Sequence, residues 1–225
     1  YCPCPSGFQD IAQHLQWIEK DRIGIVPGLS TWNDDTPDVM RGEEIQIFGA
    51  LSAQQIQSAQ FVLPGTHSKW AQVLNGKIEA FKTFMTGEFY ALLSQHSILA
   101  KTCLPDAPLK KDVFLDGVMQ SQKPGVLLHH AFSARSLALF EKLNPAQSSS
   151  YISGLLIGEE IKSAKTNTKD EGTPLFILGN GQLTQRYSFA MEALATNATA
   201  LADEVTWTGL WALAHHLYPN DFKLS

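Results

Sequence analysis

The chain has 225 residues, 44% of them hydrophobic, which is enough to build a sizeable core in one large domain or two small ones. Its formal net charge of -5 argues against nucleic acid and anionic membranes as main partners, although helix N-termini and a few basic side chains can still hold an anionic substrate locally. Three cysteines are too few for a disulfide scaffold, so a cytoplasmic location is expected, and no apolar run reaches the length of a membrane-spanning helix.

The first part of the chain predicts short elements. Ser6 can cap a helix whose apolar face would carry Ile11, Leu15 and Ile18. The predicted elements are a helix over residues 8–19, a strand over 22–26, a polar turn over 31–37, a helix over 42–51 and a second short helix opening with a capping box at 52–55.

A run of strands follows, and its turns are the clearest local signals. Three strands are predicted over residues 60–63, 69–74 and 77–84. Asn75-Gly76, the strongest short hairpin signal, joins the last two. The first pair is joined by the turn at residues 64–68.

The rest of the chain is mainly helical. Helices are predicted over residues 88–97, 112–120, 125–143, 149–164, 182–194 and 205–217, with a charged loop at 166–173 and a buried strand at 175–178. Trp207 and Trp211, four apart on the last helix, are expected to fill the core. Hairpins followed by helices and a strand–glycine–helix unit predict an α/β protein with a mixed sheet.

The turn P-G-T-H-S at residues 64–68 is the first candidate site. Gly65 lets the backbone approach a ligand closely, and consecutive amides can form an anion-binding nest. Thr66 and Ser68 add hydroxyl groups, and His67 can donate to an oxygen. The alternative interpretation is an ordinary hairpin with polar turn residues.

Glu43 and Glu44 open the helix that precedes these strands. Acidic side chains in a first turn are favourable for the helix by themselves. The functional interpretation is that Glu43 accepts a proton from an attacking hydroxyl or helps to hold hydrated magnesium. Phosphoryl transfer requires such a carboxylate near the nucleophile, in-line positioning and neutralisation of charge.

Gly179, Asn180 and Gly181 separate the buried strand from a helix, where a glycine-rich turn can admit a nucleotide base or ribose. Such turns are also common without any ligand. The chain contains neither G-x-x-x-x-G-K-[ST] nor G-x-G-x-x-G, which disfavours a P-loop or a Rossmann site.

Further candidates are helical side chains. Arg135, among apolar neighbours, is either an ion-paired surface arginine or a bidentate clamp for a substrate carboxylate. Thr86 and Glu88 flank Gly87 at a helix start, where capping is the default and contact with sugar hydroxyls is the alternative.

The order of these elements is more specific than any one of them. A glycine–acid helix start, a strand–Gly-Thr-x-Ser–strand hairpin and a later strand–glycine–helix turn resemble the second lobe of the actin-like sugar-kinase superfamily. The blocks D-V-M-R-G-E-E-I-Q-I-F-G-A, L-P-G-T-H-S-K-W, F-K-T-F-M-T-G-E, Y-I-S-G-L-L-I-G-E-E-I and L-T-Q-R-Y are similar to the 2-keto-3-deoxygalactonate kinase family.

The resemblance implies an α/β fold, namely an actin-like ATPase (ribonuclease H-like) lobe with a mixed sheet flanked by helices. Kinases of this family begin with a D-x-G-S/T phosphate loop that has no match here, so the N-terminal lobe is expected to be largely missing. The expected organisation is a remnant of that lobe over residues 1–37 and a C-terminal lobe over 38–225, with a phosphate hairpin (60–84), a helical region (88–164) and an adenosine-binding unit (174–195).

The resemblance also implies an activity: ATP-dependent phosphorylation of 2-dehydro-3-deoxy-D-galactonate at its terminal hydroxyl. Magnesium would bridge phosphate oxygens and keep several waters, with no protein residue assigned as its ligand. The implied roles are general base for Glu43, with Glu44 second; phosphate contact for Gly65, Thr66, His67 and Ser68; adenosine contact for Gly179, Asn180 and Gly181; and substrate contact for Arg41, Thr86, Glu88 and Arg135.

Two other hypotheses stay open: a non-catalytic ligand-binding or regulatory lobe of the same fold, and a kinase for another sugar acid. The expected partners are the sugar acid and ATP, with no nucleic acid and no membrane, and a homodimer remains an option.

Overall fold

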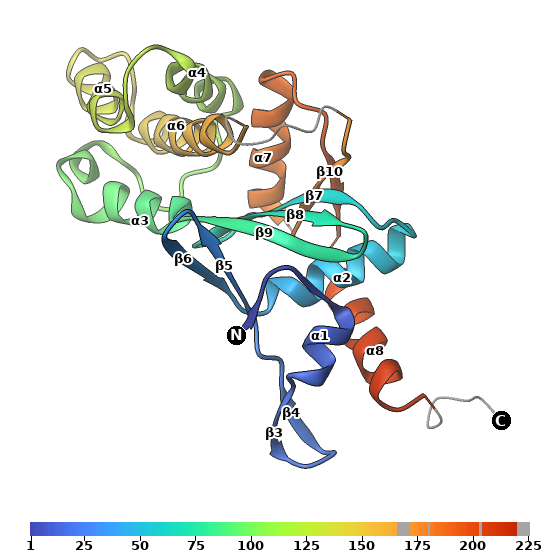
Figure 1. Cartoon of the computed structure of the whole chain (residues 1–225). Helices are drawn as coiled ribbons and strands as arrows, with labels where there is room; N and C mark the ends of the chain where they lie inside the picture. The colour runs from blue at the N-terminus through green and yellow to red at the C-terminus, as the bar shows by residue number, and fades with distance from the viewer. Residues whose placement is uncertain (166–171, 180, 203, 220–225) are drawn as a thin grey trace.

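The computed structural model describes residues 1–165, 172–179, 181–202 and 204–219. Its centre is a six-stranded mixed sheet (Figure 1) with the strand order β11-β10-β7-β8-β9-β2. The strands are β2 (Ser6–Gly7), β7 (Ala59–Leu63), β8 (Ser68–Leu74), β9 (Lys77–Phe84), β10 (Leu175–Leu178) and β11 (Thr199–Leu201). The predicted α/β class with a mixed sheet is confirmed.

The three central strands form an antiparallel meander, whereas β10 runs parallel to β7 and to β11. The tight turn between β8 and β9 is made by Asn75 and Gly76, with φ values of 51° and 74°. Two successive left-handed residues are the geometry that this dipeptide favours in a hairpin, so the predicted turn is confirmed.

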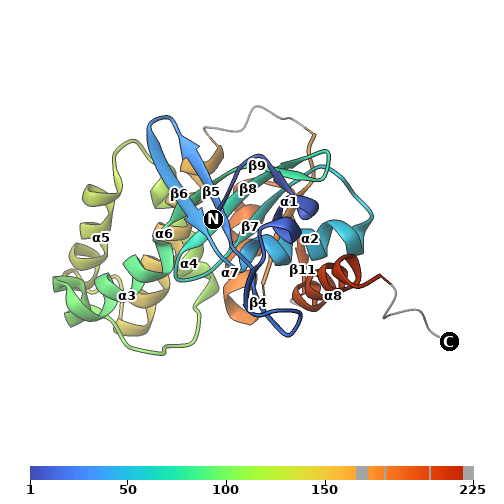
Figure 2. The same cartoon turned by 60° about the horizontal axis from the view of Figure 1, so that its bottom comes forward.

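Helices cover both faces of the sheet (Figures 1 and 2), and the strands alternate between two cores. Phe61, Leu63 and Phe176 belong to a core shared with α2 (Glu43–Gln54), whereas Val62 and Ile177 belong to a core shared with α4 (Lys111–Gln122), α6 (Pro145–Lys165) and α7 (Gly181–Ala193). Because both faces are covered, β7 and β10 are apolar at nearly every position.

Helix α8 (Val205–Leu217) crosses α2 closely. A Cβ atom at Gly209 would lie 2.1 Å from the carbonyl oxygen of Ile45, so only glycine permits this approach. Val205, Gly209 and Leu213 form the buried stripe of α8. The expectation for Trp207 and Trp211 is therefore wrong: they lie off this stripe and are 75% and 58% exposed.

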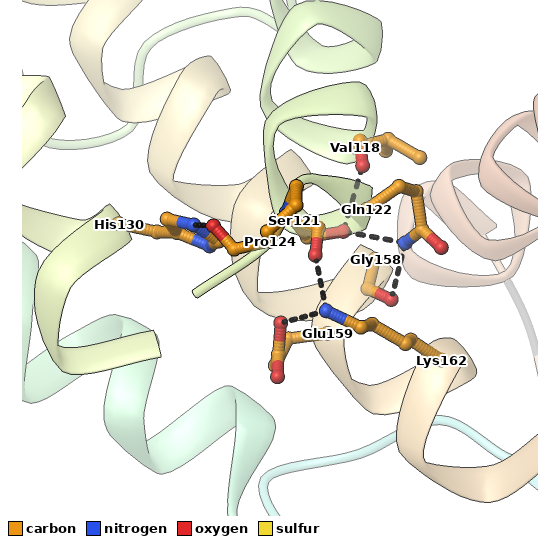
Figure 3. Close-up of polar contacts among 8 residues, drawn as sticks. All are labelled: Val118, Ser121, Gln122, Pro124, His130, Gly158, Glu159 and Lys162. Carbon is orange, nitrogen blue, oxygen red and sulfur yellow. Dashed lines mark hydrogen bonds and ion pairs between the residues drawn. The ribbon is translucent and has the colours of Figure 1, made fainter. Parts of the chain in front are cut away.

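A helical layer contains α3 (Thr86–His96), the 3-10 helix η1 (Ile98–Thr102), α4, α5 (Leu127–Leu139) and α6. Helices α4 and α6 meet at Gly117 and Gly154, where an added Cβ atom would lie 2.1 Å and 1.9 Å from a backbone carbonyl oxygen of the other helix. Figure 3 shows Lys162 of α6 donating to the carbonyl oxygen of Ser121, 2.9 Å away, in the last turn of α4. This bond satisfies a carbonyl that a helix end leaves without an intrahelical partner.

In the first 55 residues, three of the predicted secondary-structure elements are wrong. Helix α1 (Phe8–Gln13) ends early, and β3 (Gln16–Glu19) pairs with β4 (Ile23–Ile25) in an exposed hairpin. The apolar face expected for a helix over residues 8–19 is not buried at its far end, because Ile18 is 68% exposed.

The predicted polar turn at residues 31–37 is instead a hairpin. Strands β5 (Leu29–Asn33) and β6 (Thr36–Met40) pair directly, and β1 (Cys2–Pro3) adds to β5. The reversal takes only a short turn in which Asp34 adopts a φ of 55°, a left-handed conformation that aspartate tolerates.

The helix expected to open at residues 52–55 does not exist. Helix α2 continues through Gln54, and Gln55 ends it in a left-handed conformation with a φ of 53°. Leu51 remains packed in the core, so burial favours continuing the helix over restarting it.

Residues 1–37 share the main core with the rest of the chain. Cys2, Ile11 and Leu29 pack in the same cluster as Phe61, and β2 pairs with β9. The assignment of these residues to a different lobe, like the other predicted domain boundaries, stays a prediction. Within the described residues, no helix is both long enough and apolar enough to cross a membrane.

Candidate active site

Two of the predicted ligand turns leave the sheet at one edge. Strands β7 and β10 are parallel neighbours, with Val62 opposite Ile177. The residues that follow them, the turn at 64–67 and Gly179, therefore emerge beside each other. Ligands of open α/β sheets bind at the carboxyl ends of the strands, which is the position of this edge. Asn180 lies outside the described residues.

Two helices begin at the same edge. Ser68 at the start of β8 pairs with Phe84 at the end of β9, and α3 begins directly afterwards at Thr86. Helix α7 begins at Gly181, directly after β10. The N-terminus of a helix carries unpaired amide groups and partial positive charge, which favour an anion.

Helix α2 directs its N-terminus to this end of the layer as well. It packs on β7 and is joined to it by a short connection, so helix and strand run in opposite directions. Twelve helical residues span about 18 Å, and the five residues of β7 span about 16 Å. Glu43 at the start of α2 and Leu63 at the end of β7 are thus on the same side of the molecule.

The turn at 64–67 is docked on the start of α3. An added Cβ atom at Gly87 would lie 2.5 Å from the carbonyl oxygen of Gly65 and 2.8 Å from the Cα atom of Thr66. The amide of Glu88 donates to the carbonyl oxygen of Thr66 over 3.0 Å, and His67 Nε2 lies 2.5 Å from Glu88 Oε2. The structure therefore brings together the predicted phosphate turn and the predicted substrate residues of α3.

Ser68 differs from the rest of the turn because its side chain is fully buried. Its hydroxyl lies 2.8 Å from the hydroxyl of Tyr187, which donates to Glu160 Oε2 over 2.6 Å. Thr66 and His67 are exposed. A contact between the Ser68 hydroxyl and a ligand stays a prediction, and this geometry does not favour it.

The two glutamates of α2 have different environments. Glu43 is partly exposed, and its Oε2 accepts the amide of Arg41 over 2.9 Å. Glu44 is fully buried, its Oε2 accepts the amide of Gly42 over 2.7 Å, and its Oε1 has no hydrogen-bond partner among the described residues. Burial raises the pKa of Glu44. Glu43 is therefore the carboxylate that a substrate can reach.

The contacts that hold the turn at 64–67 on α3 involve neither of the two predicted substrate arginines. Arg41 is exposed, and its guanidinium lies 4.8 Å from the ring centroid of Tyr1. Arg135 lies half-buried on α5, which packs on α6 and η1. The substrate roles of both arginines stay predictions.

Arg186 on α7 is a cation at the turn that the sequence analysis did not single out. It lines a cavity of about 60 Å³ with Gly65, Thr86, Gly87 and Tyr187. Its Nη1 donates to Ser153 Oγ over 3.0 Å, whereas its buried Nε has no partner among the described residues. The only sequence signal was its place in L-T-Q-R-Y, one turn into the helix after the glycine turn.

Larger cavities are found elsewhere among the described residues. One of about 360 Å³ covers the middle of β8 and β9 and is lined by Trp32, Trp70 and Lys82 among others; none of the predicted site residues lines it. Another of about 270 Å³ is lined by Thr86, Phe89 and Glu160 among others, so Thr86 lies between this cavity and the small one at the turn. Glu43 lines none of these three.

A mixed sheet between two helical layers, with a hairpin turn and helix N-termini at one edge, is the arrangement expected for the actin-like kinase lobe that the motifs resemble. The chain matches the model of the 2-keto-3-deoxy-galactonokinase family over residues 1–213. It belongs to this family of carbohydrate kinases, and the resemblance drawn from its motifs is confirmed.

Two relatives and one solved structure agree. The chain is 34% identical to a 2-dehydro-3-deoxygalactonokinase of Escherichia coli (strain K12), covering 96% of this chain and 72% of that one. It is also 34% identical to the probable 2-dehydro-3-deoxygalactonokinase DgoK1 of Rhizobium meliloti (strain 1021), over 97% and 73%. A crystal structure from Sinorhizobium meliloti, assigned as a 2-dehydro-3-deoxygalactonokinase, superposes with a TM-score of 0.90 at 32% identity, over 97% and 74%.

Proposed function

We propose that the chain transfers the terminal phosphoryl group of ATP to 2-dehydro-3-deoxy-D-galactonate, giving the 6-phosphate and ADP. The observation that carries this proposal is the family match over residues 1–213, which includes every predicted site residue. The alignment of the turn at 64–67 with Gly179 at one edge of the sheet supports it, because these are the two segments assigned to the nucleotide.

In the proposed arrangement, the ATP phosphates lie against Gly65, Thr66 and His67. The N-termini of α3 and α7 supply partial positive charge to the phosphates, although the amide of Glu88 in α3 already donates to Thr66. Gly179 and its neighbours approach the adenosine. Such fixed dipoles stabilise the charge that develops during transfer without having to reorganise.

The sugar acid would be held by side chains on the other side of the phosphates. Its terminal hydroxyl would attack the γ-phosphorus in line as the bond to the leaving ADP breaks, and Glu43 would take the hydroxyl proton. Arg41, Thr86, Glu88 and Arg135 are the candidates for the remaining contacts. Thr86 and Glu88 are the best supported of these, because α3 is docked on the turn.

Magnesium fits this site as a companion of the nucleotide. In the described part of the chain, no group of three or more histidine, cysteine or acidic side chains could bind a metal ion on its own. Mg²⁺ usually keeps several waters and binds substrate phosphates with one or two carboxylates, and the accessible carboxylates here are Glu43 and Glu88. When bound, the ion would neutralise charge on the phosphates.

A coupled assay that follows ADP release tests the proposal on the 225-residue chain. It would supply ATP, Mg²⁺ and a panel of keto-deoxy acids and aldonates, and compare kcat/KM across the panel. The highest kcat/KM is expected for 2-dehydro-3-deoxy-D-galactonate. Preference for another sugar acid would change the assigned substrate, and calorimetric binding of ATP without turnover on any member would indicate a ligand-binding lobe. A cytoplasmic location and a homodimer remain predictions.

A further inference from the structure

A buried carboxylate that the proposed chemistry does not use lies behind the turn. Glu160 of α6 is 3% exposed. A buried charge is costly unless hydrogen bonds compensate for lost hydration. Burial raises the pKa of Glu160, while donated hydrogen bonds from Thr86, Tyr187 and Trp70 act in the opposite direction.

Three donors from three different elements converge on this carboxylate. Trp70 of β8 donates through Nε1 to Oε1 over 2.7 Å. Tyr187 of α7 donates to Oε2 over 2.6 Å, and the hydroxyl of Thr86 at the start of α3 donates to the same oxygen. One side chain of α6 therefore ties together the strand, the helix and the helix start that surround the turn.

The direction of the hydrogen bonds follows from counting protons. A tyrosine hydroxyl has one proton, and that of Tyr187 is donated to Glu160. The bond between Ser68 and Tyr187 must then be donated by Ser68. The series runs from Ser68 through Tyr187 to Glu160, so the residue that ends the phosphate turn is anchored to the same carboxylate as Thr86.

We propose that Glu160 is a positioning residue that fixes the turn at 64–67 relative to Thr86 through Tyr187 and Ser68. In this role it acts through the hydroxyl groups that donate to it rather than through contact with a ligand. It aligns the segment assigned to ATP with a residue assigned to the sugar acid, so the kinetic part of this inference rests on the proposed function. The structural part, a turn held in place by a buried carboxylate, does not.

Tyr187→Phe is the sharpest test because it removes one hydroxyl and keeps the ring. Tyr151→Phe is the matched control: Tyr151 is also a buried tyrosine, and its hydroxyl bonds to Ser133 Oγ over 2.8 Å, within the helical layer. Both variants should lose a similar amount of thermal stability. Only Tyr187→Phe is expected to speed amide hydrogen exchange in peptides covering residues 64–69 and to raise the Kd for ATP, by roughly three- to tenfold.

A second pair changes the carboxylate itself. Glu160→Gln keeps the shape of the side chain and one acceptor oxygen. Its amide NH₂ group is a donor, however, and cannot accept the hydrogen bonds that hydroxyl groups donate to the carboxylate in the unmodified chain. The variant should reproduce the exchange phenotype of Tyr187→Phe. Glu159→Gln is the control, since the neighbouring Glu159 pairs with Lys162 at 3.9 Å near the end of α4 (Figure 3).

Equal exchange at residues 64–69 in Tyr187→Phe and Tyr151→Phe would overturn the inference, whatever happens to stability. Faster exchange in Tyr187→Phe together with an unchanged Kd for ATP would overturn the kinetic part. Failure of the unmodified chain to bind ATP would refute the proposed function but not the structural inference. Hydrogen exchange at residues 64–69 would still decide whether Glu160 holds the turn.

Discussion

Gly87 lies against Gly65 so closely that a methyl group at Gly87 would come within 2.5 Å of the Gly65 carbonyl oxygen. The contact joins the first turn of α3 to the hairpin turn between β7 and β8. The carbonyl belongs to the backbone and cannot move aside as the end of a side chain could. Glycine at position 87 is thus a requirement of the docked turn.

Gly87→Ala should therefore destabilise the fold, although alanine is the better helix former. Overpacking typically costs about 1–3 kcal/mol, more than the roughly 1 kcal/mol that alanine gains over glycine in a helix. Urea denaturation measures the change. Gly7→Ala is the control, because its Cβ atom would have no neighbour closer than 3.4 Å. A Gly87→Ala variant as stable as the unmodified chain would show that the contact is not tight.

Glu43→Gln should abolish most sugar phosphorylation and leave ATP affinity nearly unchanged. Loss of a general base commonly lowers kcat by about 10²- to 10⁴-fold, whereas the amide keeps the size of the side chain. Steady-state kinetics and calorimetry with ATP give the two quantities separately. Turnover at the unmodified rate would remove Glu43 from the mechanism.

Glu44 should make stability depend on pH in the direction set by its raised pKa. Below about pH 4.3 the carboxyl is protonated in the folded and unfolded states alike, and burial carries no charge. As pH rises through the higher folded-state pKa, the folded state must ionise a buried group while the unfolded state has already ionised, so stability is lost.

Glu44→Gln cannot ionise and serves as the comparison. The free energy of unfolding of the unmodified chain, minus that of the variant, should fall as pH rises from about 4 towards neutrality. Urea denaturation at several pH values measures this difference. A difference that stays constant would contradict the raised pKa.

Arg186→Met should raise the KM for ATP more than Arg135→Met does, since Arg186 lines the cavity at Gly65 and Arg135 does not. Methionine keeps a long apolar stem, so packing changes are small. Arg135→Met should instead raise the KM for the sugar acid if its proposed role holds. Equal effects of the two variants on both KM values would contradict the distinction between them.

The sequence predicted the parts of the fold that local chemistry determines. Asn75-Gly76 dictates its turn, and the apolar run at β10 dictates a buried strand. The helix expected over residues 8–19 ends early because the chain enters the hairpin of β3 and β4, where Ile18 is largely exposed. The hairpin of β5 and β6 was missed because its pairing is set by tertiary contacts. The stripe of α8 was misjudged because the close contact between Gly209 and Ile45, not the tryptophans, determines which face is buried.

The candidate site was predictable to a similar extent. Motif order identified the turn at 64–67 and Gly179, and parallel pairing then placed them together. Arg186 and Glu160 carried no separate signal, since an arginine and a glutamate within helices normally face solvent. Only packing shows that Glu160 is surrounded by donors and that Glu44, unlike Glu43, is buried.

The helix starts at the carboxyl edge also bear on how an acidic chain could hold a polyanion. Backbone amides do not gain or lose protons in the range where histidine and cysteine titrate, and acetylation of lysine does not remove them. The contribution that peptide groups make to holding the phosphates would therefore stay constant across physiological pH.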